Sequence, residues 1–335
     1  MSQTSQTSHA SRIIGLDMAR ALAIVGMIVV HMASLLWSTK LVLNGIPAAL
    51  FAVIAGATLM IIGRRFSLNA WLRIIARGGI IMLIGLAMLP VGGWIQVVLV
   101  AMGLTMILVS WVPPLNVWWK VALFIAATAA ATVRYAPFTL PQIYPLLAWI
   151  AYFLAGMILY EVYLRGTTAE GFAPGRTRAI VRWAFSAVSL VVTGMGMYLR
   201  FEPEMPSWLR FGGHTGVLGE IVLAVAVSAV VLHLCLLAGT AARAMCYPLA
   251  ALGSMSLTVY VLHVLTANYW QSHVAIHNTW SALGFIVVFL VLATVWKKFV
   301  GQGPLEKLVS FLVRAIAPAA PAASISNAAA EKGNR

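Results

Sequence analysis

Charged side chains are scarce in this sequence: they occupy only 9% of its 335 positions. A soluble domain has about 25% charged residues, so this chain has too few of them to cover a surface in contact with water. The hydrophobic content of 62% and the mean hydropathy of +0.95 equally exclude a disordered chain. The composition therefore excludes an ordinary soluble enzyme and indicates an integral membrane protein.

Acidic residues and cysteines are scarcer still. Eight Asp and Glu stand against 22 Lys and Arg, which gives a net charge of +14. The basic residues fall between apolar runs and form no stripe on a polar face, so they indicate membrane topology and argue against nucleic-acid binding. Cys235 and Cys246 lie in or beside apolar segments without a redox motif, and we expect two free thiols.

The long apolar runs indicate helices. They are about 20 residues long and continuous, whereas the strands of a membrane barrel alternate between apolar and polar residues. We therefore predict an all-α fold, a polytopic transmembrane helix bundle with about ten membrane-spanning helices. Proline and glycine clusters mark the turns. The expected spans are 13–36, 43–63, 75–90, 94–112, 115–133, 142–162, 181–199, 215–238, 248–268 and 279–298.

The bundle is flanked by polar ends. We expect a disordered N-terminus over 1–12, a transmembrane domain over 13–300, an amphipathic interfacial helix over 301–316 and a disordered tail over 317–335. Most basic residues fall on the side of the bundle that carries both termini. Since Lys and Arg are retained in cytoplasmic loops, we expect a multi-pass protein of the cell (inner) membrane with both termini in the cytoplasm.

The first span contains three ionisable residues, Asp17, Arg20 and His31, embedded in apolar sequence. An ionisable group inside a membrane is costly unless it is paired or faces a cavity, so it indicates a functional site. Asp17 and Arg20 are i,i+3 neighbours and can pair. Arg20 and His31 are eleven residues apart, about three helical turns, which places them on nearly the same face. We therefore expect Arg20 and His31 to face a polar path through the bundle, and we take Asp17, Arg20 and His31 as candidate catalytic residues.

Several segments, in order along nearly the whole chain, resemble one family. They are RIIGLDMARALAIVGMIVVH, LFAVIAGATLMII, YPLLAWIAYFLAGMILYE, GGHTGVLGE, LAALGSMSLTVYVLHVL and GPLEKL. The chain resembles the heparan-alpha-glucosaminide N-acetyltransferase-like bacterial membrane proteins. These belong to the wider transmembrane acyltransferase superfamily, in which an arginine and a histidine with ten residues between them lie on the first helix. The resemblance implies transfer of an acyl group from cytoplasmic acyl-CoA, with acetyl-CoA the expected donor, to a hydroxyl or amine of an extracytoplasmic glycan or glycolipid.

The resemblance assigns a role to one residue, and residue type and position suggest roles for six others. The family's histidine role falls on His31, and attack on a thioester needs a general base whose pKa is near neutrality. We favour this role over that of a nucleophile that takes the acyl group. His263 is expected at similar depth as a second base or binding group, and His214 as an acceptor-binding residue. Four arginines near the first cytoplasmic loop are expected to bind the phosphates of CoA: Arg64, Arg65, Arg73 and Arg77.

Other interpretations stay open. Asp17 and Arg20 could anchor the helix at the interface, the histidines could be packing residues, and the arginine cluster could be an ordinary topology signal. The chain could also be a proton-coupled transporter or flippase of small solutes or lipid-linked sugars, or a haem protein that uses His31 and His263.

Membrane lipids are expected partners, and a homo-oligomer is compatible with the sequence. We expect no nucleic acid and no metal. His273 and His277 have a spacing that could hold a metal on a helix, but no third ligand is near them in the sequence.

Overall fold

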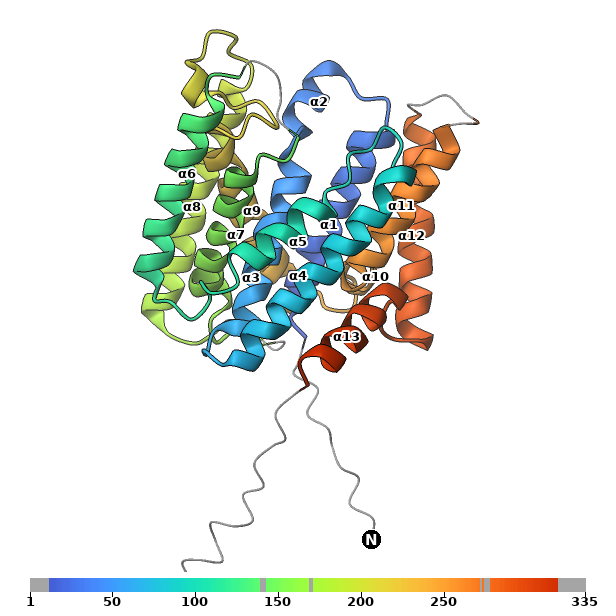
Figure 1. The fold of residues 1–335 in the computed structure, drawn as a ribbon. Coiled ribbons are helices and arrows are strands. Elements are labelled where there is room, and N and C mark those ends of the chain that lie inside the picture. Colours follow the sequence, from blue (N-terminus) through green and yellow to red (C-terminus); the bar gives the residue numbers. More distant parts are fainter. Residues whose placement is uncertain (1–11, 139–142, 169–170, 272, 274–277, 319–335) are drawn as a thin grey trace, which may run out of the picture.

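The computed structural model describes residues 12–138, 143–168, 171–271, 273 and 278–318, and every regular element within them is a helix (Figure 1). The all-α prediction is confirmed. The elements are α1 (Ile14–Met32), α2 (Trp37–Leu43), α3 (Ile46–Gly63), α4 (Leu68–Met88), η1 (Leu89–Val91), α5 (Leu99–Leu108), α6 (Val117–Tyr135), α7 (Leu146–Leu159), η2 (Tyr160–Leu164), α8 (Arg176–Leu199), η3 (Ser207–Leu209), α9 (Leu218–Ala241), α10 (Tyr247–Ser254), α11 (Ser256–Gln271), α12 (Thr279–Phe299) and α13 (Pro304–Ile316).

Within the described part of the chain, eight helices are long and apolar enough to cross a membrane. A ninth span results if α10 and α11 are counted together, although these two helices meet at a bend of 80°. The polytopic bundle is thus confirmed, with eight or nine candidate spans in the described chain where about ten were predicted. The exceptions are the segments predicted at 94–112 and 248–268.

The segment predicted at 94–112 contains only the ten residues of α5, which extend about 15 Å at 1.5 Å per residue. The rest of it is irregular turns. The chain still returns to the end of the bundle where α4 begins, because the indole nitrogen of Trp71 donates to Ser110 Oγ at 3.0 Å. The segment predicted at 248–268 is broken at Met255, whose φ of −118° and ψ of 34° are not helical.

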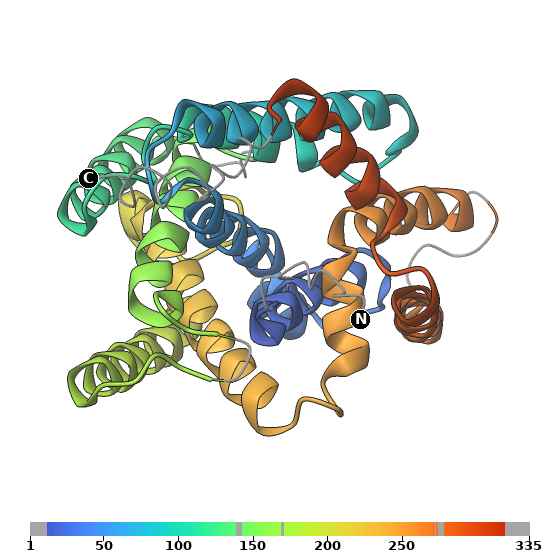
Figure 2. The same cartoon turned by 90° about the horizontal axis from the view of Figure 1, so that it is seen from below.

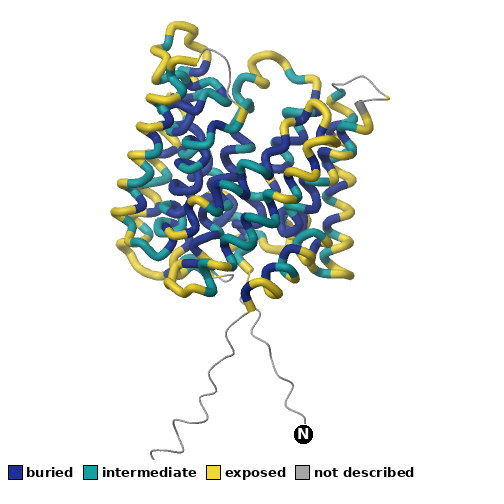
Figure 3. Tube along the Cα trace, in the orientation of Figure 1, coloured by how far each residue is buried: buried dark blue, intermediate teal, exposed yellow. Residues whose placement is uncertain are grey.

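The helices form an inner group and an outer group. α1, α3, α7 and α9 are mostly buried, whereas α6, α8 and α12 expose most of their side chains at the edge of the bundle. Viewed from below, α1 and α3 lie in the middle, with α8 and α12 at the periphery (Figure 2). Buried residues accordingly fill the interior and exposed ones cover the outside (Figure 3). The outer helices therefore present apolar side chains to the surrounding lipid.

The described chain begins and ends on the same side of the bundle, where α1 starts and α13 lies (Figure 1). We call this side the N-terminal face and the other side the opposite face. α13 falls within the predicted amphipathic segment 301–316 and packs against α4 and α11. Two of its own residues, Val309 and Val313, are buried, whereas its Phe311 is exposed. The predicted disordered ends, 1–12 and 317–335, lie almost wholly outside the described residues.

Helix packing in the centre depends on close backbone approach. α3 crosses α7 at Gly156, where an added Cβ would overlap the carbonyl oxygen of Val53. α10 crosses α1 at Gly253, where a Cβ would overlap the carbonyl oxygen of Asp17. Small residues at such crossings are the usual means of packing helices in membranes, because lipid gives apolar side chains no reason to associate. The second crossing holds the break after α10 beside the ionisable residues of α1.

Candidate functional site

A cavity of about 800 Å³ lies at the N-terminal face, beside the first turns of α1. Its walls come from segments far apart in the sequence, including α1, α3, α4, the break between α10 and α11, the end of α12, and α13. We call it the N-face cavity. Its charged lining residues are Arg12, Asp17, Arg20, Arg77, Lys297 and Glu306. Basic groups therefore outnumber acidic groups in its wall.

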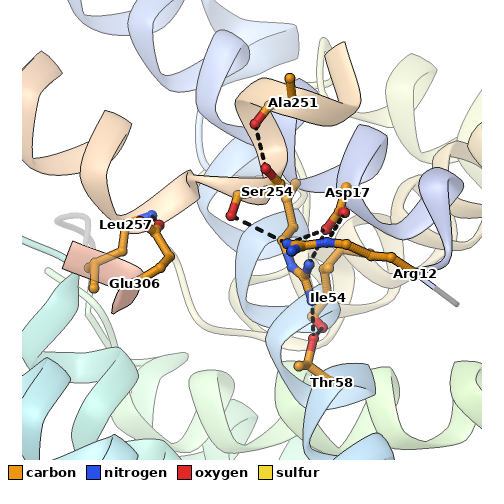
Figure 4. Close-up of polar contacts among 9 residues, drawn as sticks. Arg12, Asp17, Ile54, Thr58, Ala251, Ser254, Leu257 and Glu306 are labelled. Atoms are coloured by element: carbon orange, nitrogen blue, oxygen red, sulfur yellow. Dashed lines mark hydrogen bonds and ion pairs between the residues drawn. The ribbon is translucent and has the colours of Figure 1, made fainter. Parts of the chain in front are cut away.

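Asp17 joins two guanidinium groups at the wall of this cavity (Figure 4). Its Oδ2 accepts from Arg12 Nε at 2.5 Å, and its Oδ1 accepts from Arg20 Nη1 at 2.5 Å. Arg20 Nη2 also donates to Thr58 Oγ1 on α3 at 2.6 Å. Asp17 is only 3% exposed, so its ion pair with the largely buried Arg20 is shielded from water, whereas the side chain of Arg12 is half exposed. The predicted pairing of Asp17 with Arg20 is present, and Arg12 is a partner that the sequence analysis did not identify.

The carboxylate of Glu306 accepts hydrogen bonds from the first residues of α11, at the helix break, and not from a described basic side chain (Figure 4). Its Oε1 accepts from the backbone nitrogens of Leu257 at 2.7 Å and Thr258 at 3.2 Å, and its Oε2 accepts from Thr258 Oγ1 at 2.6 Å. The Thr258 hydroxyl in turn accepts from the backbone nitrogen of Leu305 at 3.2 Å. The first turns of α11 and α13 thus satisfy each other's free N–H groups. This reciprocal cap fixes α13 as a wall of the N-face cavity.

Two basic residues of the cavity are left without a matching anion. The side chains of Arg77 on α4 and Lys297 on α12 make no hydrogen bond or ion pair with any residue that the structure describes. The two carboxylates of the wall already accept several hydrogen bonds, Asp17 from arginines and Glu306 from α11. The N-face cavity therefore has a positive potential that favours an anionic ligand.

The deeper part of the cavity is apolar. It is lined by Phe51, Ile81, Leu99, Met102 and Met106 from α3, α4 and α5. A ligand that fits both parts must have an anionic group and an apolar or weakly polar extension.

Two histidines lie together beyond this apolar end. The rings of His31 on α1 and His263 on α11 are parallel within 3°, with centroids 5.9 Å apart. Trp94 meets His31 edge-on at 5.6 Å. His263 is fully buried, and neither of its ring nitrogens makes a hydrogen bond of normal geometry, although the carbonyls of Val259 and Tyr260 lie near the ring. The predicted similarity in depth of the two histidines is correct, but neither lines the N-face cavity.

The segment 91–98, between η1 and α5, separates the cavity from the histidine pair. Leu99 lines the cavity, and the backbone nitrogen of the preceding Val98 donates to Tyr260 Oη at 3.0 Å. The ring of Tyr260 meets His263 edge-on at a centroid distance of 5.1 Å. The inner end of the cavity and the histidine pair are therefore linked through Val98 and Tyr260.

A second tyrosine fixes the same segment from the side. Tyr144, between α6 and α7, donates its hydroxyl to the carbonyl oxygen of Gln96 at 2.6 Å. Burial raises the pKa of the Tyr144 phenol, so the hydroxyl keeps its proton and remains a donor. Asn268 of α11 also donates to the carbonyl oxygen of Val91 at 3.0 Å. The segment 91–98 is thus tied to the helices around it at several points.

At the opposite face, the GGHTG segment encloses a carboxylate. Glu220 Oε1 accepts from the backbone nitrogen of His214 at 2.6 Å, and its Oε2 accepts from Gly216 N at 2.6 Å and Thr215 Oγ1 at 3.0 Å. His214 has a φ of 62°, a left-handed conformation that these hydrogen bonds help to hold. Its ring lies 6.1 Å from that of Tyr144 and near enough to His31 to interact electrostatically.

The predicted residues thus form two groups. Asp17, Arg20 and Arg77 line the N-face cavity. His31 lies farther along α1, where His263 of α11 is stacked against it and His214 is near enough to interact electrostatically. The structure does not bring all four predicted arginines to the cavity: Arg64, Arg65 and Arg73 are outside its lining, and the first two are exposed in the α3–α4 loop. Their role in binding stays a prediction.

Sequence reasoning missed Arg12, Lys297, Glu306, Tyr260 and Glu220. Arg12 and Lys297 resembled ordinary basic residues beside a span. Glu306 and Glu220 carried a usable signal, since two of only eight acidic residues stand inside the quoted motifs GPLEKL and GGHTGVLGE. No group of three or more potential metal ligands occurs among the residues with a described placement, and His277 lies outside them.

The fold and its cavity define a polytopic helical membrane protein with a basic, partly apolar binding cavity at one face. Residues 162–314 match the model of a family of membrane proteins described as "Protein of unknown function (DUF418)". The match runs from η2 to α13, so it includes His214, His263 and Glu306, whereas α1 lies before it. No curated protein matches the chain.

Proposed function

We propose that this chain is an integral membrane acyltransferase. It takes an acyl group, with acetyl expected, from cytoplasmic acyl-CoA and transfers it to a hydroxyl or amine of an extracytoplasmic glycan or glycolipid. The proposal combines the resemblance of the sequence motifs with the chemistry of the N-face cavity. The observation that carries it is the presence of two uncompensated basic residues, Arg77 and Lys297, in a cavity whose apolar end approaches a histidine pair.

The donor matches this cavity in charge and polarity. Coenzyme A has several phosphate charges, which guanidinium and ammonium groups bind well, and Arg77 and Lys297 are available for them. Its pantetheine arm and acyl group are less polar and suit the lining formed by Phe51, Leu99 and Met102. In this proposal the N-terminal face is cytoplasmic, as expected from the distribution of basic residues. The phosphates stay near that face, and the thioester is directed toward the histidines.

The histidine pair supplies the base. An acceptor hydroxyl or amine becomes a competent nucleophile when an imidazole takes its proton. In this proposal His31 holds that role, and His263 is the second base or the group that orients it. Asp17 and Arg20 hold the beginning of α1 at the donor cavity through their ion pair, while His31 lies three turns farther along the same helix. One rigid element thus connects the donor phosphates with the base.

Binding and transfer can be tested on the purified protein. Acetyl-CoA should raise the thermal midpoint, since a ligand that binds only the folded state stabilises it. Proteoliposomes supplied with isotopically labelled acetyl-CoA and an envelope glycan and glycolipid extract should incorporate label into the extract. His31→Ala should abolish incorporation and retain the thermal shift. Absence of both the shift and the label in the wild type would refute the proposal.

One observation favours a second candidate, a transporter or flippase. The N-face cavity lies against a helix broken by 80°, with Gly253, Ser254 and Ser256 in its wall, and discontinuous helices are frequent at transporter binding sites. However, Glu306 already accepts from the first free N–H groups of α11, which removes the donors that such sites offer. Solute uptake into proteoliposomes without acetyl-CoA binding would support this candidate, and a Soret band in the purified protein would support a haem protein.

A further inference from the structure

Tyr260 holds a hydrogen-bond donor that the folded chain leaves unused. A tyrosine hydroxyl has one donor and can accept two hydrogen bonds. Tyr260 Oη accepts from the backbone nitrogen of Val98 at 3.0 Å, and its own proton meets no acceptor among the described side chains and backbone groups. The residue is only 1% exposed, so bulk water does not satisfy it. A buried donor without a partner is costly, which indicates that this proton serves a bound ligand.

The position of this hydroxyl suits a reacting carbonyl. Val98, which fixes the hydroxyl, directly precedes Leu99 at the apolar end of the N-face cavity. The ring that carries the hydroxyl lies against His263, which is stacked on His31. Tyr260 itself is outside the lining of the cavity, so a thioester carbonyl would reach its hydroxyl from the end of the cavity at Leu99.

We propose that Tyr260 is a catalytic residue whose O–H donates a hydrogen bond to the thioester carbonyl oxygen during acyl transfer. This inference rests on the proposed function. The acceptor oxygen or nitrogen forms a bond to the carbonyl carbon, and the electron pair of the C=O double bond moves to oxygen as the imidazole takes the acceptor's proton. Tyr260 stabilises this oxyanion and keeps its own proton. The double bond then forms again, the C–S bond breaks, and the departing thiolate takes the proton from the imidazolium.

The hydrogen bond from Val98 gives Tyr260 its orientation. It occupies one acceptor site of the hydroxyl and comes from a backbone segment that Tyr144 and Asn268 also hold. The hydroxyl is therefore oriented before the oxyanion forms and needs no reorganisation during the reaction. Such preorganised donors are the basis of oxyanion stabilisation in sites that exclude water. Tyr144 differs in this respect, because its proton is already donated to the carbonyl oxygen of Gln96.

Three single variants test the inference in the labelled acetyl transfer assay on full-length protein in proteoliposomes. Tyr260→Phe removes only the hydroxyl and should lower kcat by about 10²- to 10³-fold, with the thermal shift by acetyl-CoA retained. Val98→Pro removes the N–H that orients the hydroxyl, and the φ of −74° at this residue suits proline. It should lower kcat by about tenfold or less. Tyr163→Phe is the matched control, because it removes the hydroxyl of a buried tyrosine that is bonded to Ser186 and lies outside the cavity lining, and it should stay within about threefold of wild type.

The outcomes separate the inference from the proposed function. If wild type transfers acetyl and Tyr260→Phe is equally active, Tyr260 is not catalytic while the acyltransferase proposal stands. If Tyr260→Phe and Tyr163→Phe lose activity equally, together with thermal stability and acetyl-CoA binding, Tyr260 is structural and the inference is overturned. If wild type neither binds acetyl-CoA nor transfers label, the proposed function itself is wrong.

Discussion

Arg20 and Asp17 are paired on one turn of α1, with Arg20 Nη1 2.5 Å from Asp17 Oδ1 at the wall of the N-face cavity. Their side chains are 17% and 4% exposed, so the pair is shielded from solvent. Arg12 occupies the other carboxylate oxygen. The single negative charge of Asp17 therefore compensates only part of the positive charge of the two guanidinium groups.

Asp17→Asn should therefore separate stability from ligand affinity. Loss of the buried anion leaves Arg20 without its partner and should lower the free energy of unfolding by about 3 kcal/mol. The cavity becomes more positive by one charge, so the rise in thermal midpoint on addition of acetyl-CoA should stay the same or increase. Thermal unfolding with and without acetyl-CoA measures both effects. A variant with normal stability that no longer responds to acetyl-CoA would show that Asp17 itself contacts the donor.

Arg77 and Arg73 form a matched pair on α4, one turn apart. Only Arg77 lines the N-face cavity. Arg77→Met should weaken acetyl-CoA binding by about 10- to 100-fold, the value of one or two hydrogen bonds to a charged group, while Arg73→Met should have little effect. Titration of each variant with acetyl-CoA, followed by thermal shift or calorimetry, gives the two Kd values. Equal weakening in both would indicate a general effect of positive charge at this face rather than contact with Arg77.

The reciprocal cap between α11 and α13 predicts a stability effect of Glu306. In Glu306→Gln an amide replaces the carboxylate that accepts from Leu257, Thr258 and the Thr258 hydroxyl. The free energy of unfolding should fall by about 1–2 kcal/mol. Glu202→Gln, at an exposed position after α8, is the control and should leave the thermal midpoint unchanged. The same midpoint in both variants would mean that the cap contributes nothing measurable.

Close packing of α10 on α1 can be tested with two glycines. Gly253→Ala places a Cβ against the carbonyl oxygen of Asp17, whereas Gly284→Ala on α12 meets nothing within 4 Å. The first change should destabilise the protein by more than about 2 kcal/mol through overpacking. The second should be neutral or stabilising by up to about 1 kcal/mol, because alanine favours a helix over glycine. Chemical denaturation in detergent compares them, and a neutral Gly253→Ala would contradict the close approach.

Most of the bundle could be predicted because long apolar runs have few alternatives in a membrane. The two segments that differ from the prediction do so for local reasons. The segment 94–112 is apolar throughout but is interrupted by turns, and hydropathy does not distinguish a short helix with turns from a full span. The bend after Ser254 was signalled only weakly, by Gly253 and two serines around Met255, residues that a continuous helix in a membrane also tolerates.

The site was predicted unevenly for a similar reason. Asp17, Arg20 and His31 stand out because each is an ionisable residue inside an apolar run, and helical spacing relates them to one another. Arg12, Lys297 and Glu306 come together only in the folded chain, from the two ends of the sequence. Since basic residues beside spans have a topological explanation, their convergence on one cavity depends on tertiary packing that composition does not encode.

The N-face cavity is built from both α1 and α13, the first and last helices of the described chain. A nascent polypeptide exposes Arg12 and Asp17 to the membrane long before the ribosome has added Glu306. The N-face cavity is therefore complete only after α13 has been synthesised, and a product terminated before that helix would carry the histidine pair without the full wall of the cavity.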